Sequence, residues 1–225
     1  MLLILVFPYS NGVPLTVFAT GSFNEFNYEV LNGTYCAITG YTGTETEINI
    51  PSEIDGYIVQ QISDEAFYEN TTIEKVVFPE TVETVGSGVF SGCINLTYVG
   101  FNSKLTNIGD SMFYGCTSLA NMTVPNGVIS IGSSAFNGCT GLTEITLPDT
   151  LTTIYSFAFS GCANLSTVNF SNGLTAIYAY AFEDCSGLQS IDIPDSVTTM
   201  AAKAFYNCTI AIQQKSSGLD ISGKM

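Results

Sequence analysis

Apolar residues recur along the chain at a fixed interval of 23 residues. From residue 73 onward, each unit carries apolar residues at unit positions one, four and six, such as Leu142, Ile145 and Leu147. Positions four and six alternate like a strand with one buried face. Position seven is proline in four units, where it ends the strand because proline cannot donate to a β-ladder. In two units it is Asn102 or Ser171, which also favour turns. We therefore expect one strand and one turn in every unit.

A phenylalanine and a cysteine recur with the same period near the end of each unit. The phenylalanines are Phe67, Phe90, Phe113, Phe136, Phe159, Phe182 and Phe205, and the cysteines are Cys93, Cys116, Cys139, Cys162, Cys185 and Cys208. A short period held this long is typical of stacked repeats, whose units cannot bury an apolar face alone. We expect each unit to form one coil: a strand, a bend, a second extended piece and a short helical turn. The phenylalanines and cysteines would then form a structural ladder inside the stack.

The cysteines stand one to a coil, so their side chains would line up rather than converge as the ligands of a tetrahedral metal do. The chain has seven cysteines, an odd number, and the six in the repeats occupy equivalent sites, which argues against a disulfide framework. We interpret the repeat cysteines as small, buried free thiols. Metal binding or redox chemistry is the alternative, and Cys36 is interpreted as a cap residue outside the ladder.

The two ends of the chain depart from the repeat. Residues 1–19 form a candidate signal peptide, with an apolar start and small residues near its end, although no positive charge opens it. We expect residues 20–47 to be an N-terminal cap or leader and residues 48–212 to be a solenoid of seven coils. The first coil contains five additional residues around 54–57, where we expect a small hairpin. Residues 213–225 are expected to form a C-terminal cap or tail.

Composition excludes several classes of function. The 225 residues include 20 acids against five lysines, which gives a net charge of −15 at pH 7. Nucleic acids and anionic membranes require clustered basic residues, so we expect neither as a partner. Beyond the N-terminus no apolar run is long enough to insert into a membrane. The chain has no histidine, which excludes Ser-His-Asp and Cys-His catalytic arrangements. We expect no enzymatic activity, no cofactor and no metal.

Strand positions three and five should face solvent between the buried positions. They carry mainly small polar groups, which suit hydrogen bonding to a protein or a glycan; a generic solvated face is the alternative. The candidate ligand-binding residues are Lys75, Tyr98, Asn121, Thr123, Glu144, Thr146, Thr167, Asn169, Ser190 and Asp192. Glu144 and Asp192 lie two coils apart, roughly 10 Å for strands spaced about 4.8 Å. Because the carboxylates of glycosidases lie about 5–9.5 Å apart, we do not favour a catalytic pair.

Tyrosines recur at other positions of the unit. Tyr155, Tyr178 and Tyr180 follow the second extended piece, whereas Tyr68, Tyr114 and Tyr206 each follow a ladder phenylalanine. We interpret them as an aromatic stripe on an outer edge, which would suit protein contacts. Packing over the helical turns is the alternative.

The whole unit, L-x-x-I-x-I-P-x-x-V-x-x-I-G-x-x-A-F-x-x-C, resembles the BspA-type (Treponema-pallidum-type) leucine-rich repeat. Six full copies, a degenerate copy at 48–70 and a leader-like segment at 35–61 carry the resemblance. It implies an α/β solenoid: a right-handed superhelix with a parallel sheet on its concave side and short helical turns opposite. It also implies a non-enzymatic, secreted or cell-surface protein that adheres to host matrix, mucin or other cells by binding extracellular protein or glycan. A passive spacer without a ligand of its own is the alternative.

Overall fold

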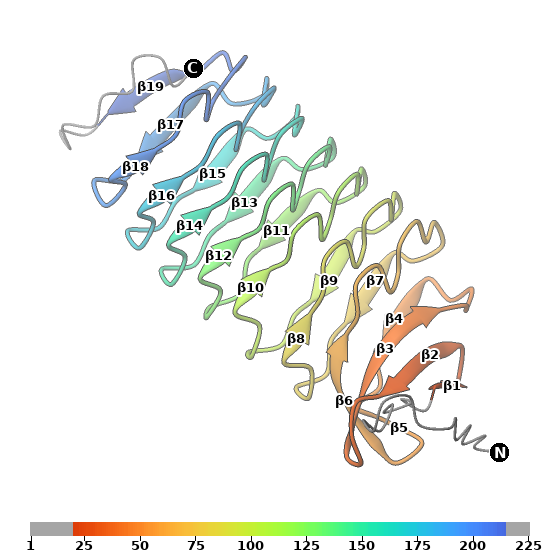
Figure 1. The fold of residues 1–225 in the computed structure, drawn as a ribbon. Helices are drawn as coiled ribbons and strands as arrows, with labels where there is room; N and C mark the ends of the chain where they lie inside the picture. Colours follow the sequence, from red (N-terminus) through yellow and green to blue (C-terminus); the bar gives the residue numbers. More distant parts are fainter. Residues whose placement is uncertain (1–19, 215–225) are drawn as a thin grey trace, which may run out of the picture.

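The computed structural model describes residues 20–214, which form a solenoid of about seven coils built from short strands (Figure 1). The candidate signal peptide and residues 215–225 lie outside the described residues. Each coil has three sides, and the same side of successive coils is stacked along the solenoid. Two of the sides are parallel β-structure and the third is made of turns.

The first side contains the strand that the apolar alternation predicts. Its members are β4 (Glu47–Asn49), β7 (Lys75–Val77), β9 (Tyr98–Gly100), β11 (Asn121–Thr123), β13 (Glu144–Thr146), β15 (Thr167–Asn169), β17 (Ser190–Ile193) and β19 (Ala211–Gln214). Neighbouring strands pair in parallel with a register of one repeat, so that Glu144 pairs with Thr167. The middle residue of each three-residue strand points inward and its two neighbours point outward. We call the outward side the strand face.

The second side is built from strands of two residues. They are β8 (Thr84–Val85), β10 (Asn107–Ile108), β12 (Ser130–Ile131), β14 (Thr153–Ile154), β16 (Ala176–Ile177) and β18 (Thr199–Met200). β10 to β18 form one continuous parallel sheet, while β8 pairs with β6 (Tyr57–Ile62) of the N-terminal region. These strands correspond to the second extended piece expected from the sequence, and their last residue is the second member of the apolar pair.

The third side carries turns in place of the expected short helical turns, since residues 20–214 contain no helix. Alternate N–H groups bond to the next coil, as Ser134 N does to Ser156 O at 3.0 Å, rather than to carbonyls four residues back. Ser134 also has a positive φ of 57°. A left-handed residue followed by bonds between coils prevents helix propagation, because an α-helix needs consecutive right-handed residues with bonds along the chain. The right-handed winding of the solenoid stays a prediction.

The N-terminal region closes one end of the stack. Strands β1 (Thr20–Phe23), β2 (Phe26–Val30) and β3 (Tyr35–Tyr41) pair antiparallel, and β3 pairs in parallel with β6. An antiparallel hairpin joins β5 (Glu53–Ile54) to β6 through Asp55 and Gly56, both with positive φ. Asp55 accepts a hydrogen bond from Tyr28 at 2.7 Å, which raises the pKa of Tyr28 to about 12. The ring of Tyr41 lies 6.0 Å from that of Phe67 and so covers the end of the phenylalanine stack.

The phenylalanines form one unbroken stack through the solenoid. Ring centroids of successive coils lie 5.7 Å apart or less, and reach 5.0 Å between Phe182 and Phe205. All seven side chains are buried. Burying a phenylalanine contributes about 1.5–3 kcal/mol, and ring pairs of this geometry add about 0.5–1.5 kcal/mol. The stack is therefore a principal source of stability shared by all coils.

The cysteines form a second column beside the rings. Each ladder thiol donates to the carbonyl oxygen of the phenylalanine 26 residues earlier, as Cys139 does to Phe113 at 3.0 Å. All seven cysteines are free, and only Cys208 is partly exposed. Burial raises the pKa of Cys93 and of Cys162 to about 12, because the thiolate would lose its hydration. The buried ladder thiols are thus protonated groups that bond neighbouring coils together, whereas the hydrogen bond with Cys185 lowers the pKa of the partly exposed Cys208.

Candidate binding face

All ten candidate ligand-binding residues are exposed on the strand face. They lie on six successive strands, two outward positions to a strand, and the buried middle residues hold those strands against the core. The exposed residues are Lys75, Tyr98, Asn121, Thr123, Glu144, Thr146, Thr167, Asn169, Ser190 and Asp192. Val77 and Gly100 complete the outward positions. The 23-residue register thus gathers residues distant in sequence onto one surface.

Several of these side chains are fixed by a neighbour on the adjacent coil. Lys75 Nζ lies 2.6 Å from Glu47 Oε1 in an exposed ion pair. Asn169 donates to Glu144 at 3.1 Å, which satisfies one carboxylate oxygen. Glu47 and Asn49 belong to the same face, and sequence reasoning missed them because the first coil is modified. The alternating pattern around Ile48, buried between two exposed neighbours, was the signal that could have found them.

The sheet beneath the strand face is interrupted twice. The strands form three groups, β4-β7-β9, β11-β13-β15 and β17-β19, so that no ladder joins β9 to β11 or β15 to β17 among the described residues. Both interruptions follow a unit in which position six is phenylalanine and position seven is not proline. The first unit contains Phe101 and Asn102, and the second contains Phe170 and Ser171. These are the two units whose turn residue departs from the repeat.

Side-chain packing at these units explains the local change. Asn102 is buried, and its amide donates to Pro79 O at 2.6 Å and to Val82 O at 2.8 Å. The ring of Phe101 stands edge-on to Phe113 with 6.1 Å between centroids, and Phe170 has the same relation to Phe182 at 5.9 Å. Position six holds a smaller aliphatic residue in the other units except the first, where Phe78 is buried, is followed by Pro79 and does not interrupt the sheet. A tilted ring therefore lies where the sheet opens, and it is only partly buried there.

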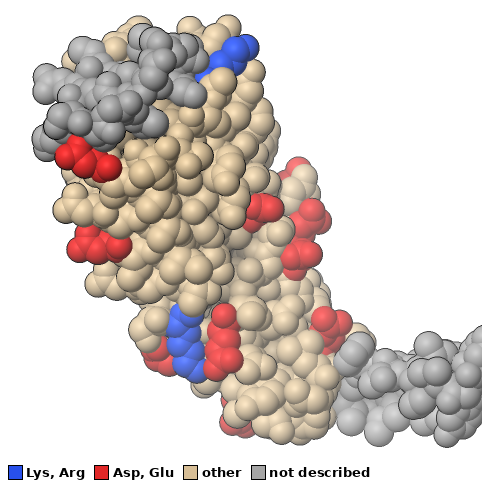
Figure 2. All heavy atoms as spheres, turned by 60° about the vertical axis from the view of Figure 1, so that its left-hand side comes forward, with Lys and Arg blue, Asp and Glu red and all other residues tan. Residues whose placement is uncertain are grey.

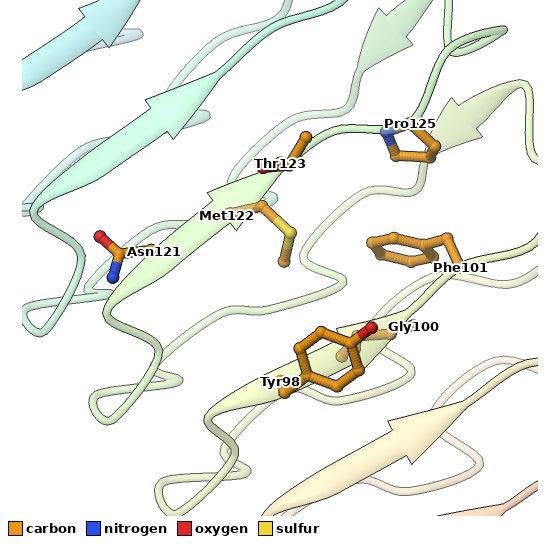
Figure 3. Close-up of a pocket in the computed structure, with 8 residues that line it drawn as sticks. Tyr98, Gly100, Phe101, Asn121, Met122, Thr123 and Pro125 are labelled. Atoms are coloured by element: carbon orange, nitrogen blue, oxygen red, sulfur yellow. The ribbon is translucent and has the colours of Figure 1, made fainter.

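The first interruption forms a hollow of about 340 Å³ between β9 and β11. Tyr98, Gly100 and Phe101 line it from one coil, and Met122 and Pro125 from the next (Figure 3). Figure 3 shows the rings of Tyr98 and Phe101 on one side of the gap and Met122, Thr123 and Pro125 on the other. Tyr98 is 53% exposed, so much of its ring is available to a partner. The lining of the hollow thus combines two aromatic rings with the polar residues Asn121 and Thr123.

The second interruption forms a hollow of about 310 Å³, three coils further along. Phe170 and Pro194 line it together with the acids Asp192 and Asp195. Of the candidate residues, Tyr98, Asn121 and Thr123 line the first hollow and Asp192 lines the second, while the other six do not line either. Glu144 and Asp192 belong to different groups of strands, β11-β13-β15 and β17-β19.

Charged groups are sparse and scattered on the face seen in Figure 2, which is mostly uncharged. Residues 20–214 contain no group of three or more histidine, cysteine or acidic side chains that could hold a metal ion. In the same range, no helix has the length and hydrophobicity of a membrane span. The surface offers aromatic, amide and hydroxyl contacts rather than a charged centre.

Comparisons with known proteins agree with this architecture. The model of the BspA type leucine-rich repeat region matches six copies, over residues 60–126 and 106–221. A leucine-rich repeat protein of T. pallidum matches with a TM-score of 0.72 and 26% identity, covering 88% of this chain and 89% of that one. A leucine-rich repeat protein of Bacteroides ovatus matches with a TM-score of 0.50 and 21% identity, covering 87% and 67%. The search of curated proteins gives no match.

The matched stretches span most of the chain and include every ladder phenylalanine. Leucine-rich repeats are protein-interaction modules, and proteins built from them are generally non-enzymatic. This chain belongs to the BspA-type leucine-rich repeat family.

Proposed function

We propose that the chain is a non-enzymatic binding module, secreted or displayed on a cell surface, that mediates adhesion to host matrix or other cells. The strand face binds an extracellular protein or glycan. The observation that carries this proposal is the hollow between β9 and β11, where exposed Tyr98 and half-buried Phe101 lie beside the polar groups of Asn121 and Thr123.

The size and chemistry of this hollow favour anchoring a projecting group of a large partner. At about 340 Å³ it lies at the small end of the range for ligand pockets, about 300–1,000 Å³. It suits one side chain or one sugar unit better than an entire small molecule. Energetic hot spots of interfaces are commonly aromatic residues surrounded by polar contacts that exclude water. Tyr98 and Phe101 supply the aromatic part, and the neighbouring strands supply the polar contacts.

The secreted or surface location is supported by the family to which the repeats belong. The net charge of −15 and the absence of arginine also direct the choice of partner away from polyanions. Matrix proteins, mucin and the surfaces of other cells are the partners to test.

The test is solid-phase binding of the purified chain to matrix proteins, mucin and bacterial cells. A strand-face variant carries Tyr98→Ala, Asn121→Asp, Glu144→Lys and Asn169→Asp. A matched control carries the same number and charge of changes on the other two sides of the coil: Tyr114→Ala, Asn107→Asp, Glu83→Lys and Thr198→Asp. All eight positions are exposed, so we expect both variants to keep the fold.

Saturable binding that is lost in the strand-face variant and kept in the control would support the proposal. Binding that survives both sets of changes would place the site elsewhere on the molecule. If the unchanged chain binds nothing in the panel, the adhesion proposal fails and the passive spacer becomes the better description.

A further inference from the structure

Five aromatic side chains gather at the corner where the second side of the coil meets the turns. Tyr155 and Phe157 follow β14, Tyr178 and Tyr180 follow β16, and Tyr206 comes from the next coil. Tyr155 stacks on Tyr178 with 5.3 Å between centroids, Phe157 stacks on Tyr180 at 5.0 Å, and Tyr180 meets Tyr206 edge-on at 6.2 Å. We call this set the aromatic corner. Only part of the expected tyrosine stripe lies in it.

The aromatic corner is exposed although its rings are large. Tyr155, Phe157, Tyr178 and Tyr206 are each between 38% and 44% exposed. Scattered single aromatic residues on a surface need no explanation, but a gathered set marks an interaction surface. Tyr68 and Tyr114 illustrate the contrast: they are somewhat more exposed, at 49% and 48%, and among the described residues no ring packs against them. Phe157 was not anticipated from the sequence, because its slot holds serine or glycine in the three preceding units.

Two of the rings occupy a strained backbone position. Phe157 and Tyr180 both have a φ of 59°, in the left-handed region that bulky side chains avoid. The equivalent residues of the other coils are Glu65, Gly88, Ser111, Ser134 and Lys203, none of which is aromatic. The left-handed backbone costs stability, and the rings placed there are only partly buried, so burial offsets only part of that cost. Recognition of a partner would account for aromatic rings at this slot.

The stacked rings of the aromatic corner begin at Tyr155 and Phe157, and the preceding coil has no ring at these slots. Gly132 and Ser134 stand one coil before Tyr155 and Phe157, so the ring faces turned toward that coil have no ring against them. Asp110 lies at this step: it accepts a hydrogen bond from Ser133 N at 2.6 Å, and a Cβ at Gly132 would lie 2.5 Å from its carboxylate. The open aromatic faces therefore lie two coils from Asp110, whose exposed carboxylate reaches the intervening coil.

Lys203 shows that rings of the aromatic corner attract a cationic side chain. Lys203 Nζ lies 5.0 Å from the ring centroid of Tyr206 and 5.6 Å from that of Tyr180, within the range of cation–π attraction. It occupies the C-terminal end of the corner, whereas the N-terminal end at Tyr155 and Phe157 has no such cation among the described residues. The net charge of −15 further favours an approaching cation.

We propose that the aromatic corner is a second docking surface, which binds an arginine- or lysine-bearing segment of a partner protein. A basic side chain lies on the open faces of Tyr155 and Phe157 while its charge meets Asp110, and apolar parts of the segment follow the rings toward Tyr206. This surface is separate from the strand face, so the two proposals stand or fall independently.

The test is fluorescence anisotropy of a labelled ten-residue peptide of alternating glycine and arginine, titrated with the full chain at physiological salt. The same peptide with glutamine in place of arginine is the control for charge. The protein variant combines Tyr155→Ala with Phe157→Ser, which are residues found at these slots in other coils, as Ala201 and Ser134. Its matched control combines Tyr68→Ala with Tyr114→Ala. Asp110→Asn keeps the acceptor for Ser133 N, and Asp149→Asn removes one charge elsewhere.

We expect the double variant to bind the arginine peptide about tenfold more weakly, which corresponds to two cation–π contacts of ordinary strength. Asp110→Asn should also weaken binding, while Asp149→Asn, the tyrosine control and the strand-face variant should bind as the unchanged chain does. Thermal unfolding should show a cooperative transition for the double variant, so that its weaker binding is not due to loss of the fold. Failure of the parent to bind the arginine peptide would overturn the proposal. Equal weakening by the corner and control changes would overturn it too, because it would show charge attraction alone.

Discussion

The interior of this solenoid and its strand face follow opposite rules. The ladder slot holds phenylalanine in all seven coils, whereas strand position three holds six different residues in six units: Lys75, Tyr98, Asn121, Glu144, Thr167 and Ser190. Both sets are brought into line by the same 23-residue register. The residues of each set therefore occupy one fixed position of the coil, and the two sets differ in whether that position is buried or faces solvent.

Packing explains the difference. A ring that stacks on its neighbour about 5 Å away leaves no room for a larger side chain and leaves a void around a smaller one. An exposed strand position touches solvent, so any residue that tolerates a strand is accepted there. The uniform ladder slots are consequently determined by the fold, and the variable strand positions are available for recognition of a partner. Three experiments separate the two classes by their effect on stability.

The largest expected effect comes from pH. Burial raises the folded pKa of four ladder thiols, Cys93, Cys116, Cys139 and Cys162, above their ordinary value of 9.0, and for Cys93 and Cys162 to about 12. Below pH 9 both folded and unfolded thiols are protonated, so this source of stability is fully present. As pH rises from 9 toward 12 only the unfolded chain ionises, and stability is lost. At pH 10 the loss is a little over about 1 kcal/mol for each of these four thiols, or about 5–6 kcal/mol together.

Urea unfolding at pH 8 and pH 10 measures this loss. A variant with Cys116→Ala, Cys139→Ala and Cys162→Ala removes three of the thiols that titrate. Its free energy of unfolding should be lower at pH 8, because cavities and lost hydrogen bonds weaken the core, but should fall less between the two pH values. An identical fall in parent and variant would show that the thiols are not the groups responsible.

The next effect contrasts one interior residue with one residue of the face. Phe136→Ala removes a ring from the middle of the stack and should cost about 3–5 kcal/mol. Tyr98→Ala removes an exposed ring and should change stability by no more than about 0.5 kcal/mol. Chemical denaturation of both variants checks the comparison. Similar unfolding midpoints for Phe136→Ala and the parent would contradict the role assigned to the stack.

Much of the fold could be predicted because each coil repeats the same pattern of buried, exposed and turn-forming residues. Alternation around Ile145 predicts a strand, the proline after it predicts the strand end, and the spacing of the phenylalanines predicts stacking. The third side differed from expectation because its conformation depends on contacts between coils. Ser134 adopts a positive φ and bonds to the next coil, and neither property can be inferred from a single unit.

The binding face could be predicted residue by residue, but its shape could not. Exposure of Tyr98 and Asn121 follows from alternation alone, whereas the hollow between them depends on how the ring of Phe101 tilts against Phe113. The signal was present in the sequence: Phe101-Asn102 and Phe170-Ser171 break the repeat at the same two positions. A departure from a strict repeat was thus the informative feature, but its structural consequence depends on packing between coils.

The smallest of the three effects tests the two departures against each other. Asn102 donates to two backbone carbonyls from a buried position, so Asn102→Ala leaves Val82 O without a donor and Pro79 O with only the 3.3 Å bond from Val82 N, and should cost about 1–3 kcal/mol. Ser171 occupies the equivalent slot, is also buried, and its hydroxyl has no hydrogen-bond partner in the described structure. Ser171→Ala should therefore leave stability unchanged within about 0.5 kcal/mol.

Thermal and urea unfolding of the two variants measure this difference. If Asn102 holds the turn beside the first hollow in place, Asn102→Ala should also weaken binding by the strand face, whereas Ser171→Ala should not. Equal destabilisation by both changes would mean that the slot, rather than the amide, supports the turn. Loss of stability in Asn102→Ala without any change in binding would separate the hollow from recognition, because the turn that supports the hollow would then be dispensable for the partner.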